Sequence, residues 1–191
     1  MGRMYITLMP VILAGVCNMV FVKTSLYKNH CKPIDNERCL ADGKRILGEN
    51  KTWIGFLSMI VFTILFQILW GVICKAVGWE NIHEIYQVKE NIPIYNIVFG
   101  FFFGFAYVIC ELPNSFVKRR FDIPPGKSKF TKIGVFFFVL DQFDSIFGVI
   151  LVLAFLVNLS VERYFAYVAL GGVTHLVVNI ILYISKMRKN I

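Results

Sequence analysis

Charged residues are scarce in this sequence. Only 17% of its 191 residues are Asp, Glu, Lys or Arg, whereas 57% are hydrophobic and 16% are aromatic. A soluble domain of this size carries more charged surface than such a composition supplies. The shortage of charge therefore excludes an ordinary soluble globular protein and indicates a protein that spans a membrane several times.

Closely spaced cysteines are also missing. The five cysteines include no Cys-x-x-Cys pair, and His30 beside one of them is too little to define a zinc site. The glycine spacing of a P-loop is absent as well, and no internal repeat or low-complexity segment divides the chain. We therefore expect a single domain, residues 1–191. The cysteines are Cys17, Cys31, Cys39, Cys74 and Cys110.

Five apolar runs reach the roughly 20 residues that a membrane-spanning helix needs. The first run is longer than the core of a secretory signal and lacks a small-residue cleavage site, so we interpret it as a retained helix. The expected fold is an all-α polytopic membrane protein with five transmembrane helices. They are predicted at about residues 4–22, 53–77, 92–112, 133–159 and 164–185.

Basic residues are divided unequally between the two sides of this bundle. Sixteen of the 20 Lys and Arg residues fall in segments 23–52, 113–132 and 186–191. Basic residues in short loops favour the cytoplasmic side, so we predict an outside amino terminus and a cytoplasmic carboxyl terminus, in a multi-pass protein of the cell membrane. The formal charge of +8 is thus concentrated on the cytoplasmic face, where it could hold anionic lipid headgroups or a polyphosphate. Nucleic acid is not expected as a partner, because basic motifs interleaved with aromatic residues are absent.

A glycine-framed basic loop precedes the second predicted helix. Its two glycines allow close backbone approaches that side chains would block, and Asn50 or Thr52 can cap the incoming helix. The free N–H groups and partial positive charge of a helix start bind anions. We therefore predict a phosphate cradle here. Its residues are Gly43, Lys44, Arg45, Gly48, Asn50, Lys51 and Thr52.

Two carboxylates interrupt the fourth apolar run. In one helix over 133–159, Asp141 and Asp144 share a face, with Cβ atoms roughly 5–6 Å apart. This spacing suits one Mg²⁺ ion, which takes one or two carboxylates and completes its shell with water and substrate phosphate. The bland alternative is a pair neutralised by Lys or Arg of the preceding loop. We favour the metal site, with Glu111 at the end of the third run as a weaker candidate ligand.

A basic cluster follows the third predicted helix. We place Ser115, Lys118, Arg119 and Arg120 in a loop, which the turn signal at residues 121–127 folds back toward the two aspartates. Cations near paired carboxylates favour a site for phosphate. The pattern leaves open whether the cluster binds a lipid phosphate or a nucleotide triphosphate.

Two helical patterns are predicted to serve packing. Gly100 and Gly104, four residues apart, permit close helix contact, and the phenylalanines around them either line an acyl-chain groove or face lipid, which we favour. His175 and Asn179 are four residues apart in the last run. We expect them to take part in buried hydrogen bonds between helices rather than in catalysis.

Two of these motifs resemble those of a known family. Residues 43–56, GKRILGENKTWIGF, resemble the first cytoplasmic motif of the archaeal CDP-archaeol synthases. Residues 114–120, NSFVKRR, with Pro125-Gly126 and the segment LDQFD at 140–144, resemble their second motif and are similar to the signature of bacterial phosphatidate cytidylyltransferases. Gln142 stands where the bacterial signature has Arg, and a His-Gly-Gly before the aspartates is missing. The chain is therefore nearer the archaeal type.

The resemblance implies transfer of CMP from CTP to a membrane lipid phosphate of archaetidic- or phosphatidic-acid type, giving a CDP-lipid and pyrophosphate. Mg²⁺ is the implied cofactor, bound by Asp141 and Asp144. The implied catalytic residues are Lys51, Lys118, Arg119, Asp141 and Asp144. The cradle and the basic cluster would hold the phosphates of CTP and of the lipid.

A protein of another class would share several of these features. A membrane lipid-binding or transport protein could use the basic face to hold anionic headgroups, and its phenylalanines could contact lipid chains. Such a protein does not need two aspartates beside a cationic, glycine-framed loop. Metal-dependent binding of CTP would distinguish the enzyme from this alternative.

Overall fold

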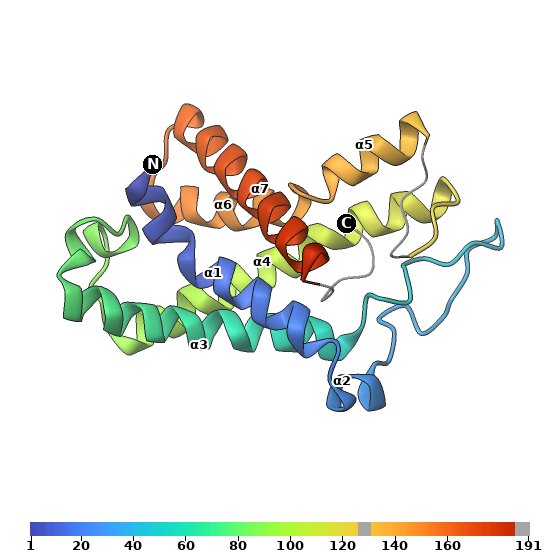
Figure 1. Ribbon diagram of the computed structural model, residues 1–191, viewed down its shortest axis with the longest axis horizontal. Helices are drawn as coiled ribbons and strands as arrows, with labels where there is room; N and C mark the ends of the chain where they lie inside the picture. The colour runs from blue at the N-terminus through green and yellow to red at the C-terminus, as the bar shows by residue number, and fades with distance from the viewer. Residues whose placement is uncertain (126–130, 186–191) are drawn as a thin grey trace.

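A computed structural model describes residues 1–125 and 131–185 of the protein (Figure 1). Within these residues, five segments are helical, long and apolar enough to cross a membrane, which confirms the predicted number of spans and a multi-pass membrane protein. The spans are α1 Gly2–Phe21, α3 Trp53–Val77, α4 Pro93–Arg120, the pair α5 Lys132–Leu140 and α6 Asp144–Val157, and α7 Val161–Ile184.

The connections carry little regular structure. They include α2 Ser25–His30 and the two 3-10 turns Trp79–Asn81 and Ile85–Gln87. Several residues that belong to the motifs or basic segments of the sequence analysis lie outside the described part of the chain. These are Gly126 of the second motif and Lys127, Lys129, Lys186, Arg188 and Lys189 of the basic face.

Hydroxyl side chains cap α2 and three helices of the membrane spans. At α3, Thr52 Oγ1 accepts a hydrogen bond from Gly55 N at 3.1 Å, and Thr131 and Ser160 play the same part at α5 and α7. Each hydroxyl satisfies one N–H group that the first helical turn leaves without a backbone partner. Thr52 is therefore the residue that caps the helix after the predicted cradle.

Glycines allow α3 and α4 to pack closely. A Cβ atom on Gly100 would lie 2.5 Å from Ile64 Cα, and one on Gly104 would lie 2.7 Å from Ile60 Cα. Backbone atoms cannot move aside as a side chain can, so only glycine fits at these positions. The prediction of close helix contact is confirmed.

The phenylalanines of α4 face two environments. Phe99 and Phe103 are buried in the core, whereas Phe101, Phe102 and Phe105 are exposed on the outside of the helices. The exposed side of α4 thus agrees with the expectation that these phenylalanines face lipid. The other side packs against the bundle.

α4 reaches further than the sequence predicted. It ends at Arg120 rather than near residue 112, with Pro113 inside it. A proline removes one backbone hydrogen bond, which membrane helices tolerate where neighbours satisfy the freed group. The prediction of a loop for the basic cluster is therefore wrong. Lys118, Arg119 and Arg120 occupy the last turn of a helix, where the partial negative charge of the helix end stabilises cations.

The fourth span is two helices rather than one. α5 ends at Leu140 and α6 begins at Asp144, so the single helix predicted over 133–159 is wrong. Between them, Gln142 N donates to Val139 O at 2.9 Å, which replaces the regular α-helical bond by a tighter one. Asp144 lies in the first turn of α6, where the positive end of the helix favours its charge. Figure 1 shows α5 pointing away from the line of α6.

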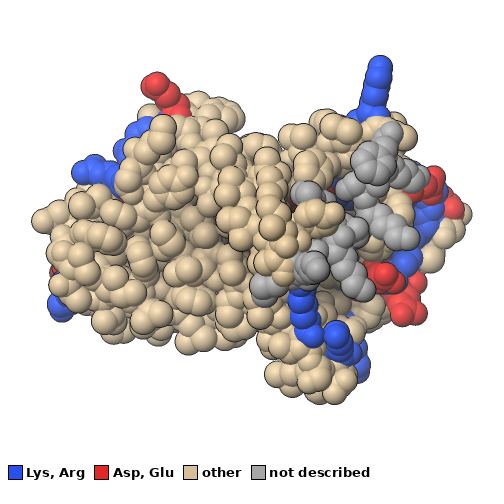
Figure 2. Space-filling model, in the orientation of Figure 1, with Lys and Arg blue, Asp and Glu red and all other residues tan. Residues whose placement is uncertain are grey.

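Charged side chains gather at the two ends of the bundle. Figure 2 shows a broad surface without Lys, Arg, Asp or Glu between them. The amino terminus and the 78–92 connection lie at one end, and the 22–52 connection lies at the other (Figure 1). This arrangement suits helices that cross an apolar layer in alternating directions.

A buried histidine lies at the end of the bundle near residues 78–92. His83 is fully buried, and its ring stacks on that of Tyr86 with the centroids 4.1 Å apart. Burial lowers the pKa of His83 to about 3. The imidazole is therefore neutral in the folded protein at neutral pH. The neighbouring Glu84 forms an ion pair with Arg163 of α7.

We expect the free energy of unfolding to fall as the pH drops below 6.5. The unfolded chain protonates His83 near its ordinary pKa of 6.5, whereas the folded protein resists protonation down to about pH 3. The contribution of neutral His83 is complete above pH 6.5 and is lost toward pH 3, with a slope of up to about 1.4 kcal/mol per pH unit. Thermal unfolding in detergent between pH 7.5 and 5 measures this slope. His83→Phe keeps a ring against Tyr86 and should reduce the slope; an equally steep slope in that variant would contradict the assignment.

Candidate active site

A cavity of about 480 Å³ opens where the 22–52 connection, α1, α3, α4, α7 and the α5–α6 break meet. Its volume is within the usual range of small-molecule sites, about 300–1,000 Å³. The cavity brings together predicted site residues from three separate stretches of the sequence. Those that line it are Asn50, Lys51, Thr52, Glu111, Ser115, Lys118, Arg119, Asp141 and Asp144.

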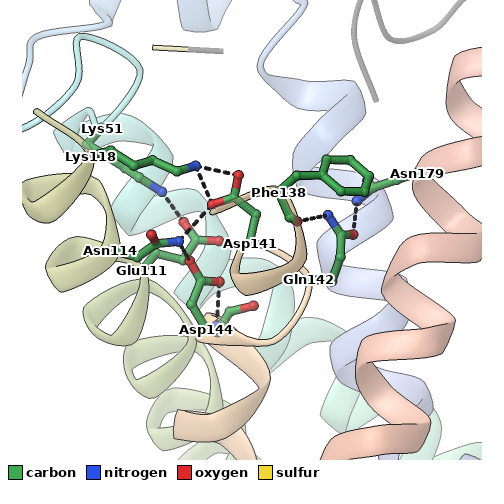
Figure 3. A network of polar contacts seen from close by, with 10 residues as sticks. Lys51, Glu111, Asn114, Lys118, Phe138, Asp141, Gln142, Asp144 and Asn179 are labelled. Carbon is green, nitrogen blue, oxygen red and sulfur yellow. Dashed lines mark hydrogen bonds and ion pairs between the residues drawn. The ribbon is translucent and has the colours of Figure 1, made fainter. Parts of the chain in front are cut away.

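Asn114 joins the two aspartates. Its Nδ2 donates to Asp141 Oδ1 at 2.7 Å and to Asp144 Oδ2 at 2.6 Å (Figure 3). These two carboxylate oxygens are therefore at most 5.3 Å apart, the sum of the two distances. Asn114 stands in the second motif, but the sequence analysis assigned it no role. Asn114 precedes Lys118 by four residues, so the two share one face of a helix. A third predicted helix extended beyond residue 112 would have shown this.

Two lysines are paired with carboxylates of the cavity. Lys51 forms an ion pair with Glu111, and Lys118 contacts both carboxylate oxygens of Asp141. Burial alone would lower the pKa of Lys51, but the charge and hydrogen bond of Glu111, with Asp144 and Asp141 beyond it, raise the pKa overall. Lys51 is therefore a firmly charged cation. Asp141 is therefore paired with a lysine, as the alternative to a metal site predicted.

Arg119 differs from these lysines in its surroundings. It is only 9% exposed, and within the described residues its Nε and Nη1 atoms have no hydrogen-bond partner. It lines the same cavity as the aspartates. A buried guanidinium without a partner is costly, and its fork of N–H groups matches the oxygens of a phosphate. Arg119 therefore suits a phosphate, which stays a prediction, and we call this part of the cavity the anion site.

The other predicted phosphate-binding cations lie outside the cavity lining. Each forms an ion pair that ties the loop of residues 35–48 to itself or to the end of α4. The pairs are Lys44–Asp122, Arg45–Asp35 and Arg120–Asp42, each at 2.7 Å. Direct contact between these three cations and a phosphate stays a prediction.

Asp35, which the sequence analysis did not single out, organises that loop. Its carboxylate is buried and accepts hydrogen bonds from Arg45 and from the N–H groups of Leu47 and Glu37. Burial alone would raise the pKa of Asp35, but these hydrogen bonds outweigh burial and lower it. The carboxylate stays charged and holds the loop.

The two glycines of the loop have separate uses. Gly43 adopts a φ of +73°, a left-handed conformation that glycine reaches without strain. Gly48 N donates to Ser115 Oγ at 3.2 Å, which joins the loop to α4. A Cβ atom on Gly48 would lie 3.3 Å from Arg119 Nη1. Gly48 therefore shapes the anion site, while Gly43 makes the turn before it.

An apolar groove of about 700 Å³ lies on the other side of the aspartates, between α4 and α5. Asn114 and Asp144 border both the groove and the polar cavity. An apolar molecule in this groove would thus contact Asn114 and Asp144. The apolar lining includes Pro113, Val117, Phe121, Phe136, Phe137 and Phe147.

The oxygen atoms around Asn114 fit a hard cation. Two oxygens bound to one Mg²⁺ lie within about 4.2 Å of each other, given bonds of about 2.1 Å, and Asp141 Oδ1 and Asp144 Oδ2 are at most 5.3 Å apart. Asn114 Oδ1 is buried there without a hydrogen-bond partner among the described residues. Among all the residues that the structure describes, no group of three or more His, Cys, Asp or Glu is suited to a metal. The pair of carboxylates would suit Mg²⁺ only with water and substrate phosphate completing its shell, and the metal itself stays a prediction.

The fold and the cavity define a class of protein: a multi-pass membrane protein with a cavity lined by charged side chains between its helices and a connecting loop. The particular family follows from the sequence. The family model for CDP-archaeol synthase, described as CarS-like, matches residues 4–191. The chain therefore belongs to the CDP-archaeol synthase family.

Individual relatives agree with this assignment. A CDP-archaeol synthase of Thermococcus kodakarensis is 32% identical over 95 residues, which are 50% of this chain and 48% of that protein. The one of Thermofilum pendens is 25% identical over 188 residues, 98% of this chain and 79% of that protein. The one of Sulfolobus acidocaldarius is 27% identical over 157 residues, 82% of this chain and 80% of that protein. The chain thus spans about half the length of the first relative and about four fifths of the other two.

A solved structure shares the fold. It is described as an intramembrane enzyme for archaeal membrane lipids biosynthesis. The TM-score is 0.62 at 23% sequence identity, and the match covers 92% of each chain. At this identity the likeness supports the five-span architecture.

Proposed function

We propose that this protein transfers CMP from CTP to a membrane lipid phosphate, giving a CDP-lipid and pyrophosphate for phospholipid synthesis. The observation that carries the proposal is the buried Arg119 in the same cavity as Asp141 and Asp144, because it joins an anion site to ligands for a cation. Membership of the CDP-archaeol synthase family supports the same chemistry.

The reaction needs no covalent enzyme intermediate. An oxygen of the lipid phosphate attacks the α-phosphorus of CTP, and the bond from that phosphorus to the oxygen bridging to the β-phosphorus breaks. Pyrophosphate leaves with the electron pair of that bond. Catalysis then rests on holding the two phosphates in line and on dispersing their negative charge. Lys51, Lys118 and Arg119 supply that positive charge.

Asp141 and Asp144 would hold Mg²⁺, which when bound neutralises phosphate charge and orients the leaving group. Asn114 holds the two carboxylates together from α4. Glu111, the weaker candidate ligand, instead positions Lys51 through its ion pair. Asn50, Thr52 and Ser115 line the cavity and supply polar groups to the bound phosphates.

The lipid substrate would lie in the apolar groove between α4 and α5. The groove's apolar lining suits hydrocarbon chains, and Asn114 and Asp144 border both the groove and the polar cavity. A lipid phosphate beside these two residues would meet a nucleotide held by Arg119. We further propose that this end of the bundle faces the cytoplasm, because 16 of the 20 Lys and Arg residues fall in sequence segments 23–52, 113–132 and 186–191, and basic residues near the ends of membrane spans favour that side.

The test is a transfer assay with purified protein in detergent. The protein is incubated with CTP labelled at the α-phosphate, Mg²⁺ and a panel of archaeal-type ether and diacyl ester lipid phosphates, and label in the organic phase is measured. We expect label to depend on Mg²⁺ and on one class of lipid phosphate, and to be lost in Asp141→Asn.

The control uses CTP labelled at the γ-phosphate, which should leave the organic phase unlabelled because that phosphate departs in pyrophosphate. Folded protein that transfers no label to any lipid would refute the proposal and favour the lipid-binding alternative.

A further inference from the structure

The α5–α6 break makes hydrogen bonds on the side away from Asn114 as well. Gln142 Nε2 donates to Phe138 O at 3.1 Å, and Gln142 Oε1 accepts from Asn179 Nδ2 of α7 at 2.9 Å (Figure 3). Gln142 is 5% exposed and Asn179 1% exposed. One buried amide thus links a carbonyl of α5 to α7 across the break.

The Gln142 side chain replaces a hydrogen bond that the break removes. In a continuous helix, Gln142 N would donate to Phe138 O, but here it donates to Val139 O. The amide of the same residue supplies the missing donor to Phe138 O. Gln142 therefore stabilises the interrupted form of this span over a continuous helix.

A second contact holds the same turn against α7. A Cβ atom on Gly172 would overlap the ring of Phe143, so this ring lies directly against the α7 backbone. Side chains along the break consequently face two partners. Asp141 and Asp144 face Asn114 on α4, whereas Gln142 and Phe143 face α7.

We propose that Gln142 and Asn179 are positioning residues for the metal-binding carboxylates. Their hydrogen bond sets the backbone of the break and so the separation of Asp141 and Asp144. This inference rests on the proposed function, because it assigns those aspartates to Mg²⁺. Supporting groups of this kind tune metal affinity without touching the ion, and their loss typically costs about 10–100-fold.

Three variants separate positioning from simple packing. Gln142→Met and Asn179→Leu each remove one amide and leave its buried partner with an unmet hydrogen bond, so both should be less stable than the parent. The double variant places two apolar side chains of similar shape together but still leaves Phe138 O without the donor of Gln142, so it should recover part of the stability and not the hydrogen bond.

Two readouts are measured on each variant. The first is the melting temperature in detergent. The second is protein-bound Mn²⁺ counted by EPR at fixed CTP without lipid, with CTP alone as the blank. We expect the dissociation constant for Mn²⁺ to rise about tenfold in both single variants and to stay raised in the double variant, even where its melting temperature recovers part of the loss.

Gln67→Met is the matched control. Gln67 is also a buried glutamine whose amide bonds to an asparagine and a tyrosine, Asn96 and Tyr86, but it lies outside the cavity lining. It should lower the melting temperature as the single variants do and leave Mn²⁺ binding unchanged.

The outcomes are distinguishable from failure of the proposed function. If the parent protein binds no Mn²⁺ with CTP and transfers no CMP, the proposed function itself fails. If the parent binds Mn²⁺ and the single variants bind it equally well, or the double variant recovers affinity together with stability, the positioning role is refuted. A rise in KM for CTP with unchanged Mn²⁺ affinity would also refute it, because the pair would then contact the nucleotide instead.

Discussion

Asp144→Asn is expected to lower kcat by about 10³-fold, the upper end of what loss of one preorganised electrostatic group costs. Asparagine keeps the shape of the side chain and an oxygen that can accept from Asn114, so the fold should persist. It removes the negative charge that binds the cation. CMP transfer and size-exclusion chromatography in detergent measure the two effects separately.

A matched control for that variant is Glu162→Gln. Glu162 also lies in the first turn of a helix, α7, but it is exposed and lies outside the cavity lining. It should retain the parent's turnover. Retained activity in well-folded Asp144→Asn protein would remove this aspartate from the mechanism.

Arg119→Met is expected to change binding and stability in opposite directions. Loss of the guanidinium should raise the dissociation constant for CTP about 10- to 100-fold, since a hydrogen bond to a charged group contributes about 1.5–3 kcal/mol. Without ligand the same change should raise the melting temperature, because a buried cation whose Nε and Nη1 have no partner among the described residues is replaced by an apolar side chain of similar length. CTP binding by calorimetry and thermal unfolding test the two halves.

Arg163→Met supplies the comparison. Arg163 is paired with Glu84 outside the cavity lining, so its loss leaves a buried carboxylate without its ion pair. This variant should melt at a lower temperature and bind CTP as the parent does. A fall in melting temperature for Arg119→Met would show that Arg119 serves the fold, and would contradict its assignment to phosphate.

Much of the cavity followed from short motifs. Asp141 and Asp144, Lys51 in the glycine-framed loop, and Lys118 with Arg119 were predicted to act together, and all line one cavity. These residues were recognisable because a charged side chain inside or beside an apolar run needs a partner or a ligand. The role of Thr52 as a helix cap follows from its place just before such a run.

The errors share one cause, which is the extent of helices near polar residues. Ending the third helix near residue 112 hid the pattern Glu111, Asn114, Ser115 and Lys118, which lies on one face of α4. Hydropathy falls at that point, yet the helix continues because the loop and the aspartates supply polar partners for it. Nothing local in the sequence reports those partners.

The sequence by itself determined the class of fold, since five apolar runs long enough to cross a membrane and a marked asymmetry of basic residues are properties of the chain alone. It also determined the family, because the motifs lie in short contiguous stretches. The tertiary structure decided which cations face the cavity. Lys44, Arg45 and Arg120 meet loop carboxylates, while Arg119 has no acidic side chain in such contact among the described residues. It also decided that the aspartates sit at a break held by Asn114 on α4 and Asn179 on α7. Ion pairs and shared amides depend on which segments meet in space, and that is settled only when the helices pack.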